Sequence, residues 1–198
     1  MTLLEDDFDE TAREHSISVL KTERLTLRAL GPADAKAIAL LANDRRIAVN
    51  TARIPHPYGV ADAEQFLATT NKRDGELCLA ITLDGTLIGG CGLHPRDGGP
   101  EIGYWLGVPY WGQGFATEAV RAVIKHAFAD LGHDTLQSSA RVSNPASRRV
   151  LEKCGFEWTC VRLCRVRALN SSVPVDCFRL DRARWVLQEP RGRLIRLA

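Results

Sequence analysis

The stretch of the chain that decides the fold is residues 106–119, which read LGVPYWGQGFATEA. An apolar strand pattern ends there, a glycine-containing turn follows, and a helical pattern begins. The unpaired N–H groups in the first turn of a helix converge where the helix dipole is positive, which favours a phosphate group. Because Gly112 and Gly114 carry no side chain, an anion can approach the backbone closely. The stretch therefore predicts an anion-binding turn between a strand and a helix.

Two common nucleotide-binding motifs do not fit this turn. The dinucleotide motif G-x-G-x-x-G would need glycine at position 117, which is Thr117, and it belongs near the first strand and helix of a chain. A Walker-type loop would need Gly-Lys-Ser or Gly-Lys-Thr after the first glycine, and residues 112–119 contain no lysine. Taken alone, the two glycines suit a simple tight turn equally well, so the flanking elements decide between the interpretations.

The residues before the turn predict two helices and an antiparallel meander. Alternating apolar residues predict strands over 24–30, 77–83, 86–93 and 101–106, with tight turns at Asp84-Gly85 and Asp97-Gly98-Gly99. Apolar residues at helical spacing predict helices over 34–45 and 61–72. A proline-rich loop, residues 54–59, separates these helices.

The residues after the turn predict a long helix and a second set of strands. A long apolar stripe predicts a helix over 116–131, followed by a strand over 136–142. Asn144, Pro145 and Gly155 are typical of the cap, the first position and the end of a short helix. Two further strands are predicted near 156–166 and 175–180. We find no internal repeat and no interdomain linker.

Length and charge limit the classes of function. A chain of 198 residues is the size of one domain, and its formal net charge of +2 does not predict nucleic-acid binding. Residues 1–14 carry six acids and one base, which gives −5 and leaves +7 for the rest of the chain. The start of the chain lacks an export signal, and the chain has no run of about 18 apolar residues. We therefore expect a cytoplasmic protein with no membrane and no nucleic-acid partner.

The six cysteines do not show the spacing of a metal site. No pair among residues 78, 91, 154, 160, 164 and 177 is separated by two residues as in a zinc knuckle. Several of them lie in apolar stretches, so we expect reduced, small core residues and no metal.

The order of these elements resembles the GNAT superfamily of acetyl-CoA-dependent N-acetyltransferases. Residues 111–116 are similar to its pyrophosphate signature Q/R-x-x-G-x-G/A, with Gly114 and Ala116 in place and Trp111 at the first position. A different residue at that position is familiar in the branch that resembles ribosomal-protein N-terminal acetyltransferases. Residues 22–28, 55–58 and 144–156 also resemble that branch.

The resemblance implies an α/β fold with a mixed central sheet, whose antiparallel meander is splayed at the acetyl-CoA site, and with flanking helices. It covers about residues 20–187, so we expect an acidic extension over 1–19, an acetyltransferase domain over 20–187 and a basic tail over 188–198.

The resemblance also implies which residues hold acetyl-CoA, the co-substrate. Main-chain groups of Leu106 and Val108 would pair with pantetheine, and the amide of Leu106 would stabilise the oxyanion of the thioester carbonyl. Asn144 would cap its helix and also lie at the cofactor. Backbone N–H groups would hold the pyrophosphate at Gly112, Gln113, Gly114, Phe115, Ala116 and Thr117.

Three residues are candidates for proton transfer. A hairpin closed by residues 97–99 would place His94 opposite Glu101, our preferred general base, so that the pair could pass a proton through one water. Glu101 could equally be a solvated strand-end carboxylate. Many superfamily members protonate the leaving thiolate with a tyrosine, but the matching position here is Leu151. Ser147, one turn earlier on the same face, is the substitute we expect, although a serine there can also simply bond nearby backbone.

The resemblance implies that the acceptor is a primary amine, whose identity the sequence leaves open. The resemblance implies that Ile54, Pro55, Pro57 and Tyr58 wall the acceptor side. A protein N-terminus is one candidate, and a small molecule such as an antibiotic, a polyamine or an amino acid is another. Because Leu151 replaces the usual tyrosine, a CoA-binding module without catalysis is a third possibility. We expect a monomer or a homodimer.

Overall fold

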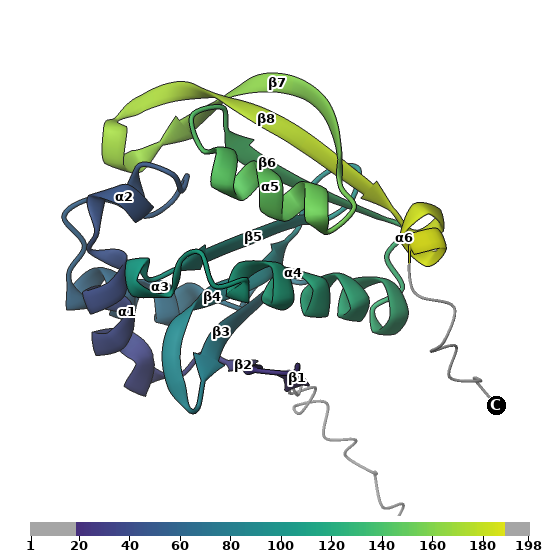
Figure 1. Cartoon of the computed structure of the whole chain (residues 1–198). Coiled ribbons are helices and arrows are strands. Elements are labelled where there is room, and N and C mark those ends of the chain that lie inside the picture. The colour runs from purple at the N-terminus through teal and green to yellow at the C-terminus, as the bar shows by residue number, and fades with distance from the viewer. Residues whose placement is uncertain (1–18, 189–198) are drawn as a thin grey trace, which may run out of the picture.

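The computed structural model describes residues 19–188, which form a central mixed sheet between two layers of helices (Figure 1). Within those residues the sheet has eight strands in the order β1-β2-β3-β4-β5-β6-β8-β7. Neighbouring strands are antiparallel except for β5 and β6, which run parallel. The strands are β1 (Leu20–Lys21), β2 (Leu25–Ala29), β3 (Leu77–Leu83), β4 (Thr86–His94), β5 (Glu101–Leu106), β6 (Thr135–Arg141), β7 (Glu157–Val166) and β8 (Ser171–Asp181). The mixed α/β sheet that the sequence predicts is confirmed.

Helices cover both faces of the sheet. One face carries α4 (Phe115–Lys125), which continues as a π-helix over His126–Asp130, and α5 (Pro145–Lys153). The other face carries α1 (Ala35–Ala42) and α3 (Val60–Thr69), with the short α2 (Arg45–Ala48) between them in the chain. A last helix, α6 (Arg182–Gln188), follows β8. Among residues 19–188 no helix is long and apolar enough to cross a bilayer.

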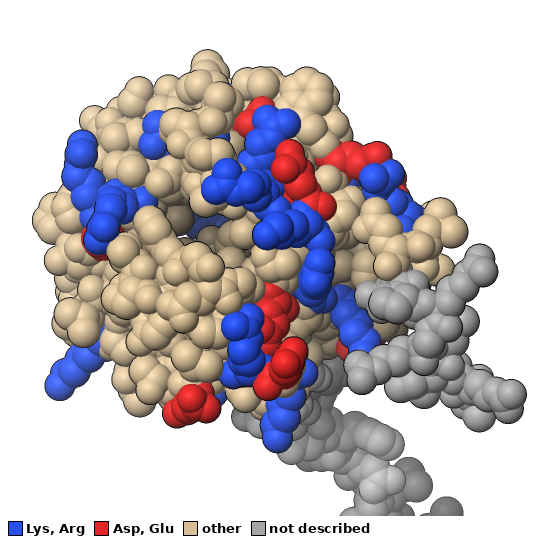
Figure 2. Space-filling view, viewed as in Figure 1, with Lys and Arg blue, Asp and Glu red and all other residues tan. Residues whose placement is uncertain are grey.

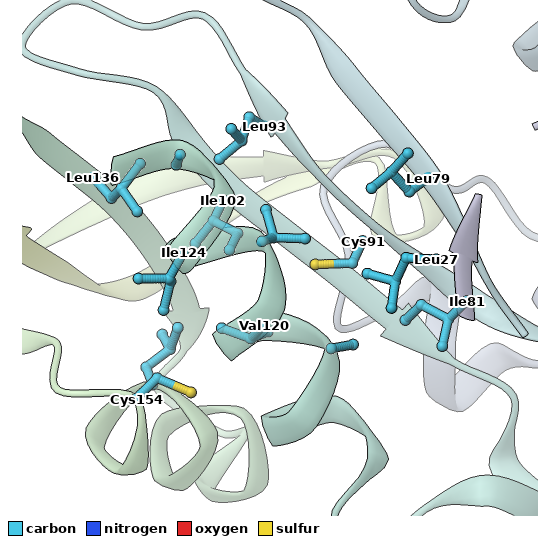
Figure 3. Packing of buried hydrophobic residues seen from close by; sticks show 14 of the residues in the cluster. Leu27, Leu79, Ile81, Cys91, Leu93, Ile102, Val120, Ile124, Leu136 and Cys154 are labelled. Atoms are coloured by element: carbon cyan, nitrogen blue, oxygen red, sulfur yellow. The ribbon is translucent and has the colours of Figure 1, made fainter. Parts of the chain in front are cut away.

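The main core lies between the sheet and α4. The apolar stripe of this helix, including Val120 and Ile124, packs against strand residues such as Leu27 and Ile102, all of them at most 2% exposed (Figure 3). Burial of such side chains contributes roughly 1.5–3 kcal/mol each, so this stripe fixes α4 on the sheet. A second cluster joins α1, α3 and Tyr58 to the opposite face.

The boundary signals around α5 are confirmed. The Asn144 side chain accepts a hydrogen bond from the Ser147 N–H at 3.2 Å, Pro145 opens the helix, and Gly155 follows its end with φ of +91°. The helix is therefore fixed at both ends by local sequence.

Several boundaries differ from those expected. The helix expected over 34–45 is interrupted after Ala42, because Asp44 caps a new helix by accepting the Arg46 N–H at 2.8 Å. No sequence pattern predicts β1 or α6. The acidic extension expected over 1–19 and the basic tail expected over 188–198 lie outside the described residues, except for residues 19 and 188.

The expectation that the cysteines are core residues is correct for half of them and wrong for the rest. All six are free; Cys78, Cys91 and Cys154 are buried, and burial raises the pKa of the Cys154 thiol to about 11. The other three lie on the β7–β8 hairpin, where Cys160 is exposed and Cys164 and Cys177 are half-buried. Apolar neighbours in the sequence do not bury these thiols, because the hairpin lies at the edge of the sheet.

A glycine in β4 allows β5 to approach closely. A Cβ atom on Gly89 would meet the Trp105 carbonyl oxygen and would lie 2.9 Å from the Leu106 Cα. We expect Gly89→Ala to reduce the free energy of unfolding by about 1–3 kcal/mol, because backbone atoms must shift. Urea unfolding followed by circular dichroism measures this.

Gly31→Ala is the matched control. Gly31 has φ of −133°, and among the described residues nothing lies within 4 Å of its added Cβ. A loss of stability in Gly31→Ala as large as that in Gly89→Ala would contradict the close-approach argument.

Candidate active site

The candidate site is built around a gap between β5 and β6. Within the described residues, the two strands share one register pair, Glu101 with Gln137. The Gln137 N–H donates to the Pro100 carbonyl at 2.9 Å, and the Ser138 hydroxyl donates to the Ile102 carbonyl at 2.9 Å. Beyond Ile102 the strands diverge. Because the groups that point to one side alternate along a strand, the main chain of Tyr104 and Leu106 faces this gap.

A rigid turn follows the gap-facing end of β5. The Gly107 N–H donates to the Ile88 carbonyl at 2.8 Å, and residues 108–110 form one turn of 3₁₀ helix. The Trp111 indole N–H donates to the Leu106 carbonyl at 2.8 Å. The residue at the first position of the expected signature therefore closes the turn back onto the strand.

The turn ends at the N-terminus of α4 with two left-handed glycines. Gly112 has φ of +76° and Gly114, the cap of α4, has φ of +84°. Side chains rarely adopt this conformation, so glycine is required here for its backbone freedom. The first N–H groups of α4 have no acceptor within the helix, so they are the groups that the sequence predicts to hold an anion at residues 112–117.

One cationic side chain contacts this turn, and both cationic and acidic side chains line the groove beside α4. The Arg24 guanidinium donates to the Gln113 carbonyl at 3.1 Å, lies 4.5 Å from the Phe115 ring centroid and pairs with Glu118 at 2.7 Å. A groove of about 800 Å³ runs from Gly114 along α4. Its cationic lining residues are Lys21, Arg24, Arg121, Lys125 and Lys153. Figure 2 shows a second hollow, between α2 and α5, with basic side chains along the α5 edge.

On the same face as α5, a serine and a tyrosine form a hydrogen-bonded pair. The Tyr104 hydroxyl lies 2.8 Å from the Ser147 Oγ and 3.1 Å from the Ser147 carbonyl oxygen. Burial raises the pKa of Tyr104 well above its usual value, and the hydrogen bond to Ser147 opposes the shift without cancelling it. Both hydroxyls therefore stay protonated and can serve as hydrogen-bond donors.

On the opposite face of the gap, the predicted pairing of His94 and Glu101 is confirmed as a register pair of β4 and β5. Glu101 accepts from Arg96 at 2.9 Å and from the Ser139 hydroxyl at 2.9 Å, and Arg162 lies 3.5 Å away. Burial alone would raise the pKa of Glu101, but the Arg96 and Ser139 hydrogen bonds and the two arginine charges outweigh it and lower that pKa. Glu101 is therefore ionised and weakly basic.

His94 is a neutral imidazole near neutral pH. Burial lowers its pKa, the Arg53 charge lowers it further, and the Glu76 carboxylate opposes both. Its Nδ1 lies 3.3 Å from Glu76 Oε1 and 3.3 Å from the nearest Arg53 nitrogen. His94 is thus available to accept a proton.

Glu76, Cys78 and His94 have ligand-type atoms within 4.8 Å of one another. The Arg53 guanidinium beside the histidine nitrogen adds a positive charge to this cluster, which opposes a metal cation.

The loop before α3 lies on the face of Glu101 and His94. The Val49 carbonyl accepts from Arg141 at 2.8 Å, and the Ala52 carbonyl accepts from the Arg167 N–H at 3.1 Å. The loop therefore contacts both β6 and the turn between β7 and β8.

The four loop residues expected to wall the acceptor side differ in how deeply they are buried. Tyr58 is buried in the cluster with α1 and α3, and that burial, followed by the Asp62 charge, raises its pKa to about 12. Ile54 packs against the same cluster, Pro55 is half-buried and Pro57 is exposed. Arg53, which sequence reasoning did not single out, is the loop residue that reaches His94.

Residues 24–157 match the family described as Acetyltransferase (GNAT) domain. The chain belongs to the GNAT acetyltransferase family.

Relatives and solved structures agree with this assignment. The chain is 29% identical over 149 residues to an uncharacterized N-acetyltransferase p20 of Bacillus licheniformis, covering 71% of this chain and 83% of that protein. It is 29% identical over 143 residues to a putative ribosomal N-acetyltransferase, YdaF, of Bacillus subtilis, covering 68% and 78%. The structure of Mycobacterium smegmatis RimJ in complex with CoA-disulfide superposes with a TM-score of 0.75, at 19% identity, covering 84% of this chain and 88% of that one.

Membership of this family makes the chain an acetyl-CoA-dependent N-acetyltransferase, and its residues offer groups that suit this co-substrate. The open edge of β5 offers backbone groups to an amide-containing chain, and the turn at 112–117 offers N–H groups and positive dipole to a pyrophosphate. The Leu106 carbonyl is already bonded to Trp111, so its N–H is the group left for the co-substrate. Val108 begins a 3₁₀ turn instead of extending the strand, which leaves its N–H as the group for the predicted pairing.

Two further residues of this GNAT domain were missed by sequence reasoning. Tyr104 contacts Ser147 from β5, and Arg24 contacts the glycine turn from a segment more than 80 residues earlier. The alternation of residues 101–106 places Tyr104 on the face of Ile102 and Leu106, which was a usable signal for Tyr104. Nothing in the sequence signals the contact of Arg24, because it depends on tertiary packing.

Two glycines allow a matched test of the anion-binding turn. Gly112 and Gly132 have nearly equal φ angles, +76° and +75°, and among residues 19–188 nothing lies within 4 Å of an added Cβ on either. We expect each Gly→Ala variant to lose about 1–2 kcal/mol of stability from the left-handed backbone. Gly112→Ala alone should raise the KM for acetyl-CoA, by about tenfold, because the turn must change shape. Initial rates of thiol release measure this. An equal rise in Gly132→Ala would contradict the assignment.

Proposed function

We propose that this enzyme transfers acetyl from acetyl-CoA to the α-amine of a peptide or protein N-terminus. The observation that carries the proposal is the placement of proton donors and proton acceptors on opposite faces of one gap. Ser147 and Tyr104 lie on the α5 face, whereas Glu101 and His94 lie on the other. An amine that enters from the second face can lose its proton there, and the sulfur leaving on the first face can gain one.

The weakness of the available bases favours an α-amine over a lysine. Glu101 has a lowered pKa, and so does His94, which makes both of them poor at removing a proton from a strongly basic amine. An α-amine has a pKa of about 7.7–8.0 and is partly neutral already, whereas that of a lysine is about 10.4. The relative named as a putative ribosomal N-acetyltransferase supports a protein acceptor.

In the proposed mechanism the neutral amine attacks the thioester carbonyl directly. His94 accepts a proton from the amine through water, and the nearby carboxylates Glu76 and Glu101 stabilise the resulting positive charge. The Leu106 N–H donates to the carbonyl oxygen as negative charge develops on it. Ser147 donates its proton toward the sulfur as the carbon–sulfur bond breaks, and Tyr104 orients that hydroxyl.

The function is tested by thiol release from acetyl-CoA with a panel of peptides that have free N-termini. Matched peptides with an acetylated N-terminus and one lysine are the control for side-chain transfer. We expect thiol release with the free N-termini and little with the blocked peptides. Turnover of the blocked peptides alone, or no turnover across the panel by protein that binds CoA, would overturn the proposal.

The serine–tyrosine pair gives a test of the leaving-group side. We expect Ser147→Ala to lower kcat about 10²-fold with little change in the KM for acetyl-CoA, because proton donation by a positioned group contributes about 10²–10⁴-fold. Tyr104→Phe should lower kcat less, because it keeps the serine but loses its orienting bond. Stopped assays at saturating acetyl-CoA give both values. Thr69→Ala, which removes a hydroxyl bonded within α3, is the control and should keep the wild-type kcat.

The dependence of kcat/KM on pH follows from the two lowered pKa values. Above pH 6.5 both His94 and Glu101 are already unprotonated, since their pKa values are below the usual 6.5 and 4.5. The acceptor amine is then the group that must lose a proton, so kcat/KM should rise with pH. The midpoint of the rise should lie near the pKa of the peptide amine, about 8, and the plateau above it. Two peptides whose N-terminal pKa values differ by about one unit should give midpoints that differ by the same amount. A midpoint that is the same for both would assign the titration to the enzyme.

A further inference from the structure

We propose that the acceptor carries a negative charge close to its amine, which a set of arginines on the Glu101 face binds. This proposal rests on the proposed acetyl transfer and deepens it by naming the class of acceptor. The arginines, called the acceptor-side arginines below, are Arg53, Arg96, Arg141 and Arg162.

Contacts place these four side chains around the acceptor side of the gap. Arg96 and Arg162 both contact the Glu101 carboxylate, at 2.9 and 3.5 Å, and each side chain is about half exposed. Arg53 contacts His94 at 3.3 Å from the loop before α3. Arg141 lies on β6 two residues after Ser139 and so on the same face, and it donates to the Val49 carbonyl at 2.8 Å.

Positive charge exceeds negative charge in this region. The acceptor-side arginines are faced by two carboxylates, Glu76 and Glu101, and the histidine between them is neutral near pH 7. A pocket of about 550 Å³ adjoins Glu101, and its remaining charged lining residues are Asp97 and Arg179, of which Arg179 pairs with Asp181 at 2.8 Å. The acceptor-side arginines therefore exceed the nearby carboxylates Glu76, Glu101 and Asp97 by one positive charge.

One of these arginines also has an unused donor. The Arg141 Nε is buried and has no hydrogen-bond partner among the described residues. A charged donor that is buried without a partner is costly, so an acceptor that reaches it is bound favourably. A carboxylate is the acceptor that a guanidinium binds most strongly among common biological groups other than phosphate.

The positive charge has a consequence for catalysis as well as for binding. Nearby cations disfavour an ammonium ion, so they lower the pKa of an amine bound among them. A larger fraction of the acceptor is then neutral, which compensates for the weak bases Glu101 and His94. The same charge excludes polycationic acceptors, such as polyamines and aminoglycosides, because each additional ammonium group is repelled.

The chemistry required is an α-amine with a carboxylate a few bonds away. An N-terminus followed by acidic residues and a free dicarboxylic amino acid both have it. The experiment therefore compares peptides that begin Ala-Glu-Glu, Ala-Gln-Gln and Ala-Lys-Lys, with free glutamate and spermine as separate arms.

We expect kcat/KM to be about tenfold higher for the Glu peptide than for the Gln peptide, and lowest for the Lys peptide and spermine. Arg53→Gln, Arg141→Gln and Arg162→Gln should each reduce the preference for Glu over Gln at least threefold, with the KM for acetyl-CoA unchanged. Arg184→Gln, a half-exposed arginine that contacts Glu157 from α6, is the control and should keep the full preference. Faster turnover of free glutamate than of the Glu peptide would support a negatively charged acceptor and overturn the assignment to a protein N-terminus.

Binding of the acetylated products separates this inference from the proposed function. Calorimetry on CoA-loaded protein should give tighter binding of acetyl-Ala-Glu-Glu than of acetyl-Ala-Gln-Gln, with a difference that shrinks as salt rises. This measurement does not require turnover. Equal binding of the two products, or equal kcat/KM for the Glu and Lys peptides, would overturn the inference and leave the acetyl transfer intact. Absence of turnover with tight, charge-selective product binding would overturn the proposed function alone.

Discussion

The site depends on one constraint, the limited pairing of β5 with β6. Each strand is held along its other edge, β5 by β4 over all six of its residues and β6 by β8 over all seven. The two edges that face the gap therefore keep their shape although little joins them. Backbone N–H and C=O groups left open between two rigid strands are costly unless something hydrogen-bonds to them. An extended, amide-containing ligand is one that meets this requirement.

Trp111 changes how the end of this gap is used. Its indole N–H donates to the Leu106 carbonyl, whereas the Leu106 N–H faces the gap. The same bond ties the glycine turn to β5. The glycine turn and the Leu106 end of β5 are therefore joined by one side chain. A residue at this signature position thus has a structural role in addition to its place beside the pyrophosphate turn.

Local signals in the sequence predict much of the fold, and long-range contacts explain what they miss. The strands at 77–83 and 101–106 have the predicted bounds, because alternation and tight-turn residues act over a few positions. The break between α1 and α2 depends on Asp44 capping a new helix, a signal weaker than the apolar spacing around it. Tyr104 and Arg24 belong to the site through contacts with residues 43 and 89 positions away, which no local pattern contains.

The two faces of the gap differ in the charged groups that line them. On the α4 side, neutral N–H groups lie at the start of the helix, and lysines and arginines line the groove beside it. On the acceptor side, arginines crowd a carboxylate, which lowers the pKa of Glu101 and makes it a poor base. A weaker base can still deprotonate the acceptor if the same cations lower the pKa of the acceptor amine. The same arginines then set both the charge of the preferred acceptor and the strength of the base. Weakening the arginine set should make the acceptor harder to deprotonate even as Glu101 becomes a stronger base.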